Sequence, residues 1–342
     1  MTTDGTRPTS SNLDPRKQCW VGRLPIDVQG HPYEGWVLSY VSGSSDPLQA
    51  LASKRVKTCL SRTLRWTQCV HADRSRAAGA ACVELLARSI HRAQIAAAVA
   101  PIGADGKPDI TNPLTAAEKA VVKSRILAAC DAADGALDGM VSRISACRPD
   151  PAQWVCTGGN TSNCLPANKA DYVAKFFEGA KTQSGTRIYG PWPYDPGMVG
   201  TLGTPSSFFY GIFAGEASHV YTTPPTVTPD LLTYARTADL DAEYAKIFAV
   251  SGIYTRSGRD FTNADNPNMD AFRARKSKIL MSDGTADLAL PFNDLTDYYT
   301  KVQTRYGANE AADFARAFAV PGMDHCSGGA DAPTSSTPMV PW

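Results

Sequence analysis

The stretch "KSKILMSDGTADLALP", residues 276–291, decides the fold. Its apolar run at 279–281 predicts a buried strand, and Asp287 follows in a turn. The next segment, 292–306, repeats apolar side chains at helical spacing and predicts an amphipathic helix. A further segment, 313–323, predicts a last strand that leads into the loop of His325. This alternation predicts an α/β fold with a mostly parallel sheet and flanking helices.

Asp287 and His325 each follow one of the two predicted strands. An α/β sheet carries catalytic groups on loops at the carboxyl ends of its strands, and α/β-hydrolases order their triad as serine, acid, histidine. A carboxylate so placed holds an imidazole in the right tautomer and stabilises its cation. A turn aspartate and a loop histidine are also common without any catalytic role, so spacing alone leaves both interpretations open.

The composition is that of an ordinary globular protein, with 43% hydrophobic and 20% charged residues and a net charge of +1 over 342 residues. This balance argues against a nucleic-acid or membrane-surface role for the whole chain. No apolar run approaches the roughly 20 residues of a transmembrane helix. The first residues lack the apolar core of a signal peptide.

Four of the nine cysteines form two closely spaced pairs in turn-rich segments, Cys130 with Cys147 and Cys156 with Cys164. Zinc sites usually show short C-x-x-C pairs or histidine partners, and neither accompanies these four. Two local disulfides are therefore favoured, which implies an oxidising compartment. Because no export signal is visible, either the gene product is incomplete or these cysteines stay reduced.

Further along the chain, Thr115 and Glu118 have the spacing of a capping box and begin a predicted helix. A second helix is predicted over 168–180. Residues 181–262 are rich in Pro, Gly, Thr and aromatics and are interpreted as an irregular lid or insertion. Aromatic residues of the predicted lid either line a pocket for an aromatic group or fill a core; they include Trp154, Trp192, Phe208, Phe209 and Tyr210.

Residues 54–92 are basic, with nine Lys and Arg against Asp73 and Glu84, and show no clean helical or strand period. Such a segment is either a solvated face or a patch that binds an anionic ligand.

Four segments in one order carry a family resemblance: "CDAADGALDGM" (130–140), "WVCTGGNTSNCL" (154–165), "MDAFRARKSKILMSDGTADLALP" (269–291) and "VPGMDHCSGG" (320–329). Together they resemble the tannase/feruloyl esterase family. The resemblance implies an α/β-hydrolase core with a large inserted lid, a secreted or periplasmic location, and small-molecule esters of substituted aromatic acids as substrates.

The resemblance also assigns a triad. The family's acid lies in a G-x-x-D turn, which is matched by Asp287, and its histidine precedes a cysteine, which is matched by His325 and Cys326. Its nucleophile lies in a G-C-S-x-G-G elbow, for which "GSSDP" (43–47) is the nearest match and makes Ser45 the candidate serine.

Two positions in this elbow depart from the family pattern. Ser44 replaces the cysteine that would pair with Cys326, so Cys326 lacks its expected partner. Pro47 replaces a glycine and pushes Asp46 away from helical dihedrals. Because the Asp46 N–H should help to build the oxyanion hole, we expect an impaired elbow.

The resemblance further implies a structural calcium site in the lid. Calcium prefers several hard oxygens on a flexible loop. The family's site carries over to five residues, as the side chains of Asp131, Asp134 and Asp138 and the carbonyls of Ala136 and Met140. Without the family, Asp-Gly turns after a helix explain the same pattern.

The predicted organisation has three parts. Residues 1–95 are a remnant of the hydrolase core, within which 46–80 are atypical and suggest a reading-frame error. Residues 96–265 form the lid, and 266–342 the C-terminal core. The whole resembles a C-terminal portion of the family protein. Two functions follow: a serine hydrolase for esters of hydroxybenzoic or hydroxycinnamic-type acids, or an inactive or incomplete fragment that keeps the calcium- and disulfide-stabilised lid. The sequence does not predict an oligomeric state.

Overall fold

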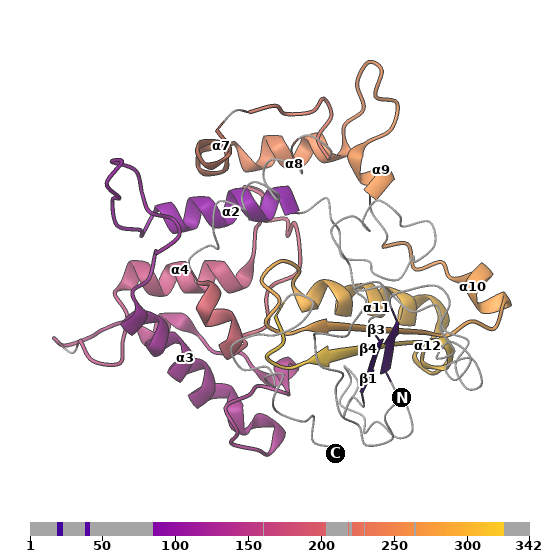
Figure 1. The fold of residues 1–342 in the computed structure, drawn as a ribbon, viewed down its shortest axis with the longest axis horizontal. Helices are drawn as coiled ribbons and strands as arrows, with labels where there is room; N and C mark the ends of the chain where they lie inside the picture. The colour runs from indigo at the N-terminus through magenta and orange to yellow at the C-terminus, as the bar shows by residue number, and fades with distance from the viewer. Residues whose placement is uncertain are drawn as a thin grey trace.

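The computed structural model describes the backbone of β1 (Cys19–Gly22) and β2 (Leu38–Val41), which pair antiparallel, and most of the chain from residue 85 onward. The described residues there are 85–159, 161–202, 218, 221–228, 230–262 and 265–324. The helical part of the molecule lies to the left in Figure 1, and the C-terminal sheet and its helices lie to the right.

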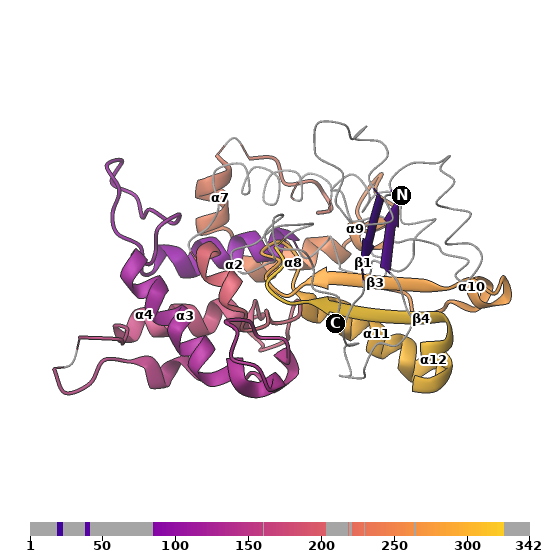
Figure 2. The ribbon, with the colours of Figure 1, turned by 60° about the horizontal axis from the view of Figure 1, so that its bottom comes forward.

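The C-terminal part is built on two parallel strands, β3 (Ile279–Gly284) and β4 (Ala315–Val320). Their register pairs Ile279 with Ala315 at one end and Gly284 with Val320 at the other. The connection consists of α11 (Phe292–Tyr306) and α12 (Ala308–Phe314), and Figure 2 shows α11 on one face of the strand pair. The predicted α/β class is confirmed by this unit. The second strand begins at Ala315 and not at 313, because α12 continues to Phe314.

The core of this part comes from the apolar stripe of α11. Leu295, Tyr298, Tyr299 and Val302 are buried at the i, i+3, i+4, i+7 spacing that the sequence predicted. Tyr299 Oη donates a hydrogen bond to the Ala315 carbonyl at 3.0 Å, so its polar end is satisfied inside the core. The helix is thereby fixed over the start of β4.

The helical part contains α2 (Leu85–Ala97), α3 (Ala116–Cys130) and α4 (Ala167–Glu178). The predicted capping box is present: Thr115 Oγ1 accepts from the Glu118 N–H at 3.2 Å, and Glu118 Oε2 accepts from the Thr115 N–H at 2.7 Å. Short 3₁₀ segments connect these helices, namely η4 (Asp131–Asp134), η5 (Ile144–Ala146), η6 (Pro151–Trp154) and η7 (Pro196–Thr201).

Aromatic side chains form much of the core of the helical part. Phe176 and Phe177 of α4 are buried, and Phe176 lies 6.1 Å from Trp192 between ring centroids. Trp154 and Trp192 are only 5% and 2% exposed. Both tryptophans therefore fill the core, which is the second of the two interpretations above. Phe208, Phe209 and Tyr210 lie outside the described residues.

The region that the sequence predicts to be irregular contains three helices. They are α7 (Leu231–Thr237), α8 (Leu240–Phe248) and α9 (Gly258–Thr262). Asp230 and Asp239 cap α7 and α8 by accepting from backbone N–H groups. Both helices pack against α2. A fourth helix, α10 (Asp270–Ala274), leads into β3. The sequence analysis predicted too little helix in this region. The helices are short, and the capping residues Asp230 and Asp239 mark where α7 and α8 begin.

Both predicted disulfides are present, Cys130–Cys147 and Cys156–Cys164. The first joins the end of α3 to the residue after η5, and the second closes the turn after η6. The alternative that these four cysteines stay reduced is therefore wrong for this structure.

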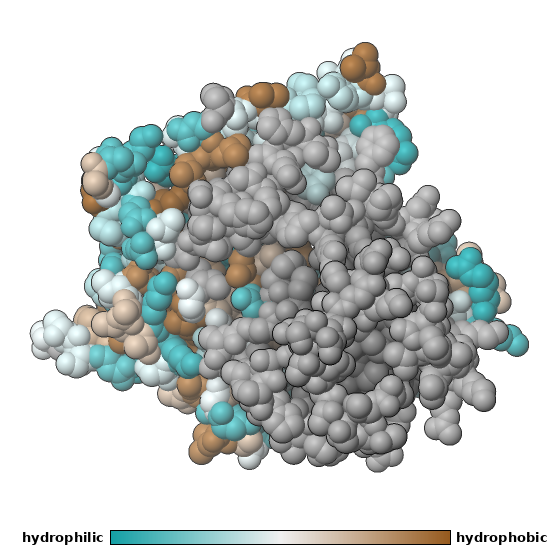
Figure 3. Space-filling model, viewed as in Figure 1, coloured by the Kyte–Doolittle hydropathy of each residue, from teal (hydrophilic) through white to brown (hydrophobic). Residues whose placement is uncertain are grey.

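One feature of the surface is a turn between α8 and α9, residues 249–254, which projects at the top of Figure 1. Ile253 is 88% exposed, Val250 and Tyr254 are also exposed, and Figure 3 shows hydrophobic atoms at this tip. Among the described helices, none has the length and apolar character needed to cross a bilayer.

Candidate active site

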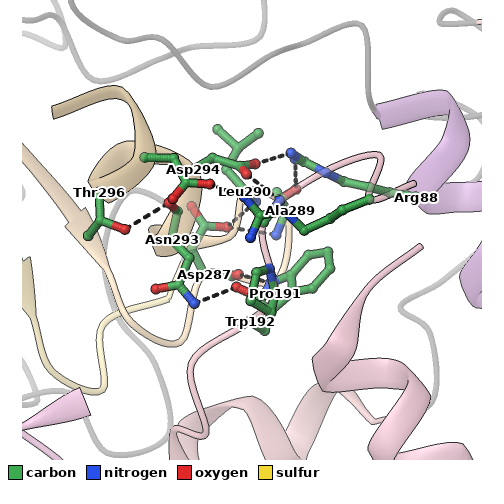
Figure 4. Close-up of polar contacts among 12 residues, drawn as sticks. Arg88, Pro191, Trp192, Asp287, Ala289, Leu290, Asn293, Asp294 and Thr296 are labelled. Carbon is green, nitrogen blue, oxygen red and sulfur yellow. Dashed lines mark hydrogen bonds and ion pairs between the residues drawn. The ribbon is translucent and has the colours of Figure 1, made fainter. Parts of the chain in front are cut away.

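Asp287 lies on the loop between β3 and α11, residues 285–291, which we call the acid loop. The Asp287 side chain is 2% exposed. Its Oδ1 accepts hydrogen bonds from the N–H groups of Ala289 at 2.7 Å and Leu290 at 3.1 Å (Figure 4). These bonds turn the backbone around the carboxylate and fix its direction at the carboxyl end of β3.

The helical part holds the acid loop through the three successive carbonyls of residues 287–289. Trp192 Nε1 donates to the first at 2.8 Å, Arg92 Nη1 to the second at 2.7 Å, and Arg88 Nη1 to the third at 3.0 Å. Figure 4 shows Arg88 and Trp192 approaching the loop from the helical side. The acid loop is therefore braced by α2 and by the segment before η7.

Arg88 also forms an ion pair with Asp294 in the first turn of α11, and the two side chains are 3% and 10% exposed. Asp294 Oδ1 accepts from the Gly190 N–H at 2.6 Å. Burial raises the pKa of Asp294, and the Arg88 guanidinium opposes that rise. The pair connects α2 with α11, which belong to the two different parts of the molecule.

Aromatic rings cover both arginines. The Arg92 guanidinium lies 4.1 Å from the Trp192 ring centroid, and Arg88 lies 4.9 Å from that of Tyr189. Arg88 and Arg92 end the basic segment that the sequence could assign to a solvated face. That assignment is wrong for these two residues, because both are buried. The remaining charges of the segment up to residue 84 lie outside the described residues.

His91 lies between the two arginines on α2, and its Nδ1 is 3.2 Å from Tyr189 Oη. Burial, together with charge repulsion from Arg92 and Lys175, lowers the pKa of His91 to about 4. Burial raises the pKa of Tyr189 to about 12. Both groups are neutral at neutral pH, so this contact joins two uncharged side chains and supports the packing of α2.

The chain that leads to His325 lies beside the acid loop. The Thr285 N–H donates to the Val320 carbonyl and the Ala286 N–H donates to the Met323 carbonyl, each at 3.1 Å. Gly284 leaves no room for a side chain, because an added Cβ would lie 2.0 Å from the Met323 oxygen. Residues 321–324 are therefore held against the acid loop.

Of the three predicted triad residues, Asp287 is the one that lies within the described part of the chain. Ser45 and His325 lie outside the described residues, as do Ser44, Pro47 and Cys326. His325 directly follows the described segment 321–324. Sequence analysis did not predict that any residue braces the acid loop. It singled out Trp192 only as an aromatic of the lid, and Arg88 and Arg92 only as part of the basic segment.

The predicted calcium loop, residues 131–140, folds around its own aspartates. Asp131 Oδ1 accepts from the Asp138 N–H at 3.2 Å, and Asp134 Oδ1 accepts from the Ala136 N–H at 2.9 Å. Asp138 Oδ1 accepts from the Met140 N–H at 3.1 Å. The three carboxylates supply the hard oxygens that calcium prefers. Within the described residues, however, no three His, Cys, Asp or Glu side chains are gathered closely enough to hold a metal ion. The donor set fits calcium in its chemistry, and binding would require the carboxylates to converge.

Comparison with known proteins places these features in a family. The model of the family described as tannase and feruloyl esterase matches residues 90–342. Mono(2-hydroxyethyl) terephthalate hydrolase of Piscinibacter sakaiensis is 32% identical over an alignment of 282 residues, which covers 72% of this chain and 46% of that protein. Feruloyl esterase B of Aspergillus niger is 28% identical over 232 residues, which are 67% of this chain and 42% of that protein.

Solved structures give the same result for the fold. An esterase from Aspergillus oryzae matches with a TM-score of 0.53 and 25% identity, over 72% of this chain and 45% of that one. Feruloyl esterase B from the same organism matches with a TM-score of 0.54 and 20% identity, over 73% and 46%. The chain thus spans less than half the length of these relatives. With a family model that covers most of the sequence, and with the acid loop and parallel strand pair in place, the chain belongs to the tannase and feruloyl esterase family.

Proposed function

We propose that this chain is part of a serine carboxylic ester hydrolase whose triad consists of Ser45, His325 and Asp287. The observation that carries the proposal is the geometry around Asp287. Its carboxylate is buried and oriented by two backbone N–H groups, and a backbone hydrogen bond joins its neighbour Ala286 to Met323, close to His325. An α/β-hydrolase carries its acid and histidine at this edge of the sheet.

In this mechanism Ser45 Oγ attacks the ester carbonyl while His325 accepts the hydroxyl proton. The Asp287 carboxylate accepts from the imidazole Nδ1–H and stabilises its cation. The imidazolium then protonates the leaving alcohol. Water attacks the acyl-enzyme by the same route, which releases the acid and regenerates the serine.

The acyl groups we propose are those of aromatic acids. The relatives are named for a monoester of terephthalic acid and for feruloyl esters, and both names describe aromatic acyl groups. The two disulfides of this chain support a secreted or periplasmic location, since such bonds persist in oxidising compartments.

The sequence also supports an alternative, which is that the chain is catalytically inactive. Ser44 stands where the family has a cysteine, and Pro47 stands where the elbow needs a glycine. Loss of one oxyanion-hole donor costs about 3–4 kcal/mol of transition-state stabilisation. The alternative is therefore a chain that keeps the family fold without turnover.

The test is hydrolysis of methyl ferulate and of a terephthalate monoester by the purified chain, with Ser45→Ala and Asp287→Asn as variants. Turnover that disappears with Ser45→Ala and falls steeply with Asp287→Asn supports the ester hydrolase. Absence of turnover in all three proteins supports the inactive alternative. Turnover that survives Ser45→Ala would remove Ser45 from the mechanism.

We also propose that residues 131–140 bind a structural calcium ion through the side chains of Asp131, Asp134 and Asp138, with the carbonyls of Ala136 and Met140. The support is a loop already curled around three carboxylates and closed by the Cys130–Cys147 disulfide. The role would be to stabilise the lid, and no catalytic step passes through it.

A further inference from the structure

A buried carboxylate, Asp195, connects three separate segments of the chain. Its side chain is 0% exposed and lies just before η7. Oδ1 accepts from the Gly197 N–H at 2.7 Å. Oδ2 accepts from the Thr285 hydroxyl in the acid loop and from the Gly322 N–H at 3.0 Å. One carboxylate therefore contacts the acid loop and the chain that leads to His325 at the same time.

The contacts around Oδ2 form a closed triangle. The Gly322 N–H also points to Thr285 Oγ1 at 3.0 Å, and Thr285 is fully buried. Each of the three groups is thus within hydrogen-bond distance of the other two. A buried carboxylate is costly unless its oxygens are satisfied, and hydrogen bonds to a carboxylate are about twice as strong as neutral ones. The triangle is therefore a rigid connection between the two loops.

Helix capping does not account for this arrangement. Asp195 Oδ1 caps η7 through Gly197, and one side-chain oxygen is sufficient for that role. The contacts of Oδ2 with Thr285 and Gly322 connect to the two loops and lie outside that role. Thr285 precedes Asp287 by two positions, and Gly322 precedes His325 by three. Asp195 therefore contacts residues that precede two members of the proposed triad by two and three positions in the sequence.

We propose that Asp195 is a positioning residue, which sets the distance between the acid loop and the segment 321–324, called the His325 loop because His325 follows it in the sequence, through Thr285 and Gly322. This inference rests on the proposed function for its effect on turnover. The link between the loops is a property of the fold that can be measured without activity. An acid and an imidazole that cooperate must stay within hydrogen-bond reach, and an error of about 1 Å can reduce turnover roughly a hundredfold.

The test compares two substitutions at position 285. Thr285→Val keeps the shape of the side chain and removes the hydroxyl, whereas Thr285→Ser keeps the hydroxyl. Thr222→Val is the matched control, because it also deletes a buried threonine hydroxyl, one that bonds to the Ser218 carbonyl outside both loops. Asp195→Asn is a fourth variant, because its amide keeps one acceptor oxygen and replaces the other with an NH2 donor. Either Gly197 or the pair formed by Thr285 and Gly322 then loses its acceptor.

Two readouts are used on the folded full chain. The first is kcat and KM for the aromatic ester. Thr285→Val and Asp195→Asn are expected to lower kcat by roughly ten- to a hundredfold with little change in KM, and Thr285→Ser is expected to recover most of the loss. The second is amide hydrogen exchange of 320–324, which is expected to accelerate in Thr285→Val and Asp195→Asn but not in Thr222→Val, while exchange in α11 stays unchanged.

The outcomes separate this inference from the proposed function. If the parent chain hydrolyses no ester but the exchange pattern appears as expected, the proposed function fails and the link stands. If the parent is active and Thr285→Val keeps both its kcat and its exchange protection, the inference is overturned and the function stands. Equal losses in Thr285→Val and Thr222→Val, or faster exchange in α11 as well, would also overturn it, because the effect would then be general destabilisation.

Discussion

Arg88 on α2 and Asp294 on α11 form a buried ion pair across 206 positions of sequence. Arg88 also donates to the Ala289 carbonyl in the acid loop. The pair therefore couples the packing of the helical part to the position of the loop that carries Asp287. Its energetic contribution can be measured with a double-mutant cycle.

We expect Arg88→Met to lower the free energy of unfolding by about 3–5 kcal/mol, because it leaves the Asp294 carboxylate buried without its cation. Arg88→Met combined with Asp294→Leu is expected to recover part of this loss, since no unpaired charge remains. Arg187→Ala is the control: it breaks an exposed pair with Asp297 and is expected to cost less than about 1 kcal/mol. Urea denaturation measures all three. Equal losses of unfolding free energy in Arg88→Met and Arg187→Ala would contradict the conclusion that the buried Arg88–Asp294 pair stabilises the fold.

Gly284→Ala is expected to displace the segment 321–324, since its Cβ would lie 2.0 Å from the Met323 oxygen. Overpacking of this kind costs about 1–3 kcal/mol. Gly200→Ala is the matched control, because nothing lies within 4 Å of its added Cβ. Thermal melts and ester hydrolysis are measured on both variants. A melting temperature for Gly284→Ala as high as that of Gly200→Ala would show that the two loops are not in contact.

Removal of the two disulfides by paired serine substitutions is expected to destabilise the helical part. In the chain-entropy model, the loop of 17 positions closed by Cys130–Cys147 is worth about 3 kcal/mol, and the loop of 8 closed by Cys156–Cys164 about 2.5 kcal/mol. Denaturation of each paired variant checks these values. Thiol labelling of the unfolded, unreduced parent provides the control, and labelling of all nine cysteines would show that neither bond forms.

Acid is expected to destabilise the chain through His91. Its pKa is about 4 in the folded chain, against 6.5 for a free histidine. Between these values the unfolded chain binds a proton that the folded chain does not. The contribution of His91 to the free energy of unfolding is therefore fully present above pH 6.5. It is lost as the pH falls toward 4, and the total loss is roughly 3 kcal/mol.

His91→Gln removes this titration and keeps a polar partner for Tyr189. The difference in unfolding free energy between pH 7.5 and pH 4.5 is expected to be smaller in His91→Gln than in the parent chain. The comparison within each protein cancels contributions from acidic groups that both share. An identical pH dependence in both proteins would mean that His91 titrates normally when folded.

Calcium is expected to raise the melting temperature if residues 131–140 bind it. At a free concentration a hundred times the dissociation constant, binding stabilises the folded state by about 2.7 kcal/mol. Asp134→Asn is expected to abolish the response to calcium and chelator. Asp171→Asn, which removes an exposed carboxylate on α4, is expected to keep it. A parent melting curve that chelator does not move would eliminate the calcium site.

Local patterns in the sequence predicted the local structure well. The Thr115–Glu118 capping box, the apolar stripe of α11 and the strand at Ile279 each depend on neighbours within a few positions. The order of strand, acid loop, helix and strand then led to the α/β class, and close spacing led to the two disulfides. In these cases the physical cause lies within one segment.

The bracing of the acid loop could not be predicted because its cause lies between distant segments. Arg88 and Arg92 appear in the sequence as the end of a basic run. Their burial is explained by contacts with distant segments, namely the carbonyls of 288 and 289, the Asp294 carboxylate and the aromatic rings above them. Asp195 precedes a proline and a glycine. That pattern indicates a turn and does not predict the hydrogen bond from Thr285 to Asp195. The helices α7 and α8 were missed because they are short and packed against α2.

The register of β3 and β4 has a consequence for how this centre tolerates change. Gly284 and Val320 are paired at the ends of the strands, so the acid loop and the His325 loop leave the sheet side by side. Their starting points are separated by one inter-strand spacing, about 4.8 Å. A residue inserted into either strand would shift one loop along the sheet by about 3.3 Å and would turn its side chains to the opposite face. The lengths of these two strands are therefore expected to be under stricter constraint than the lengths of the segments between the helices.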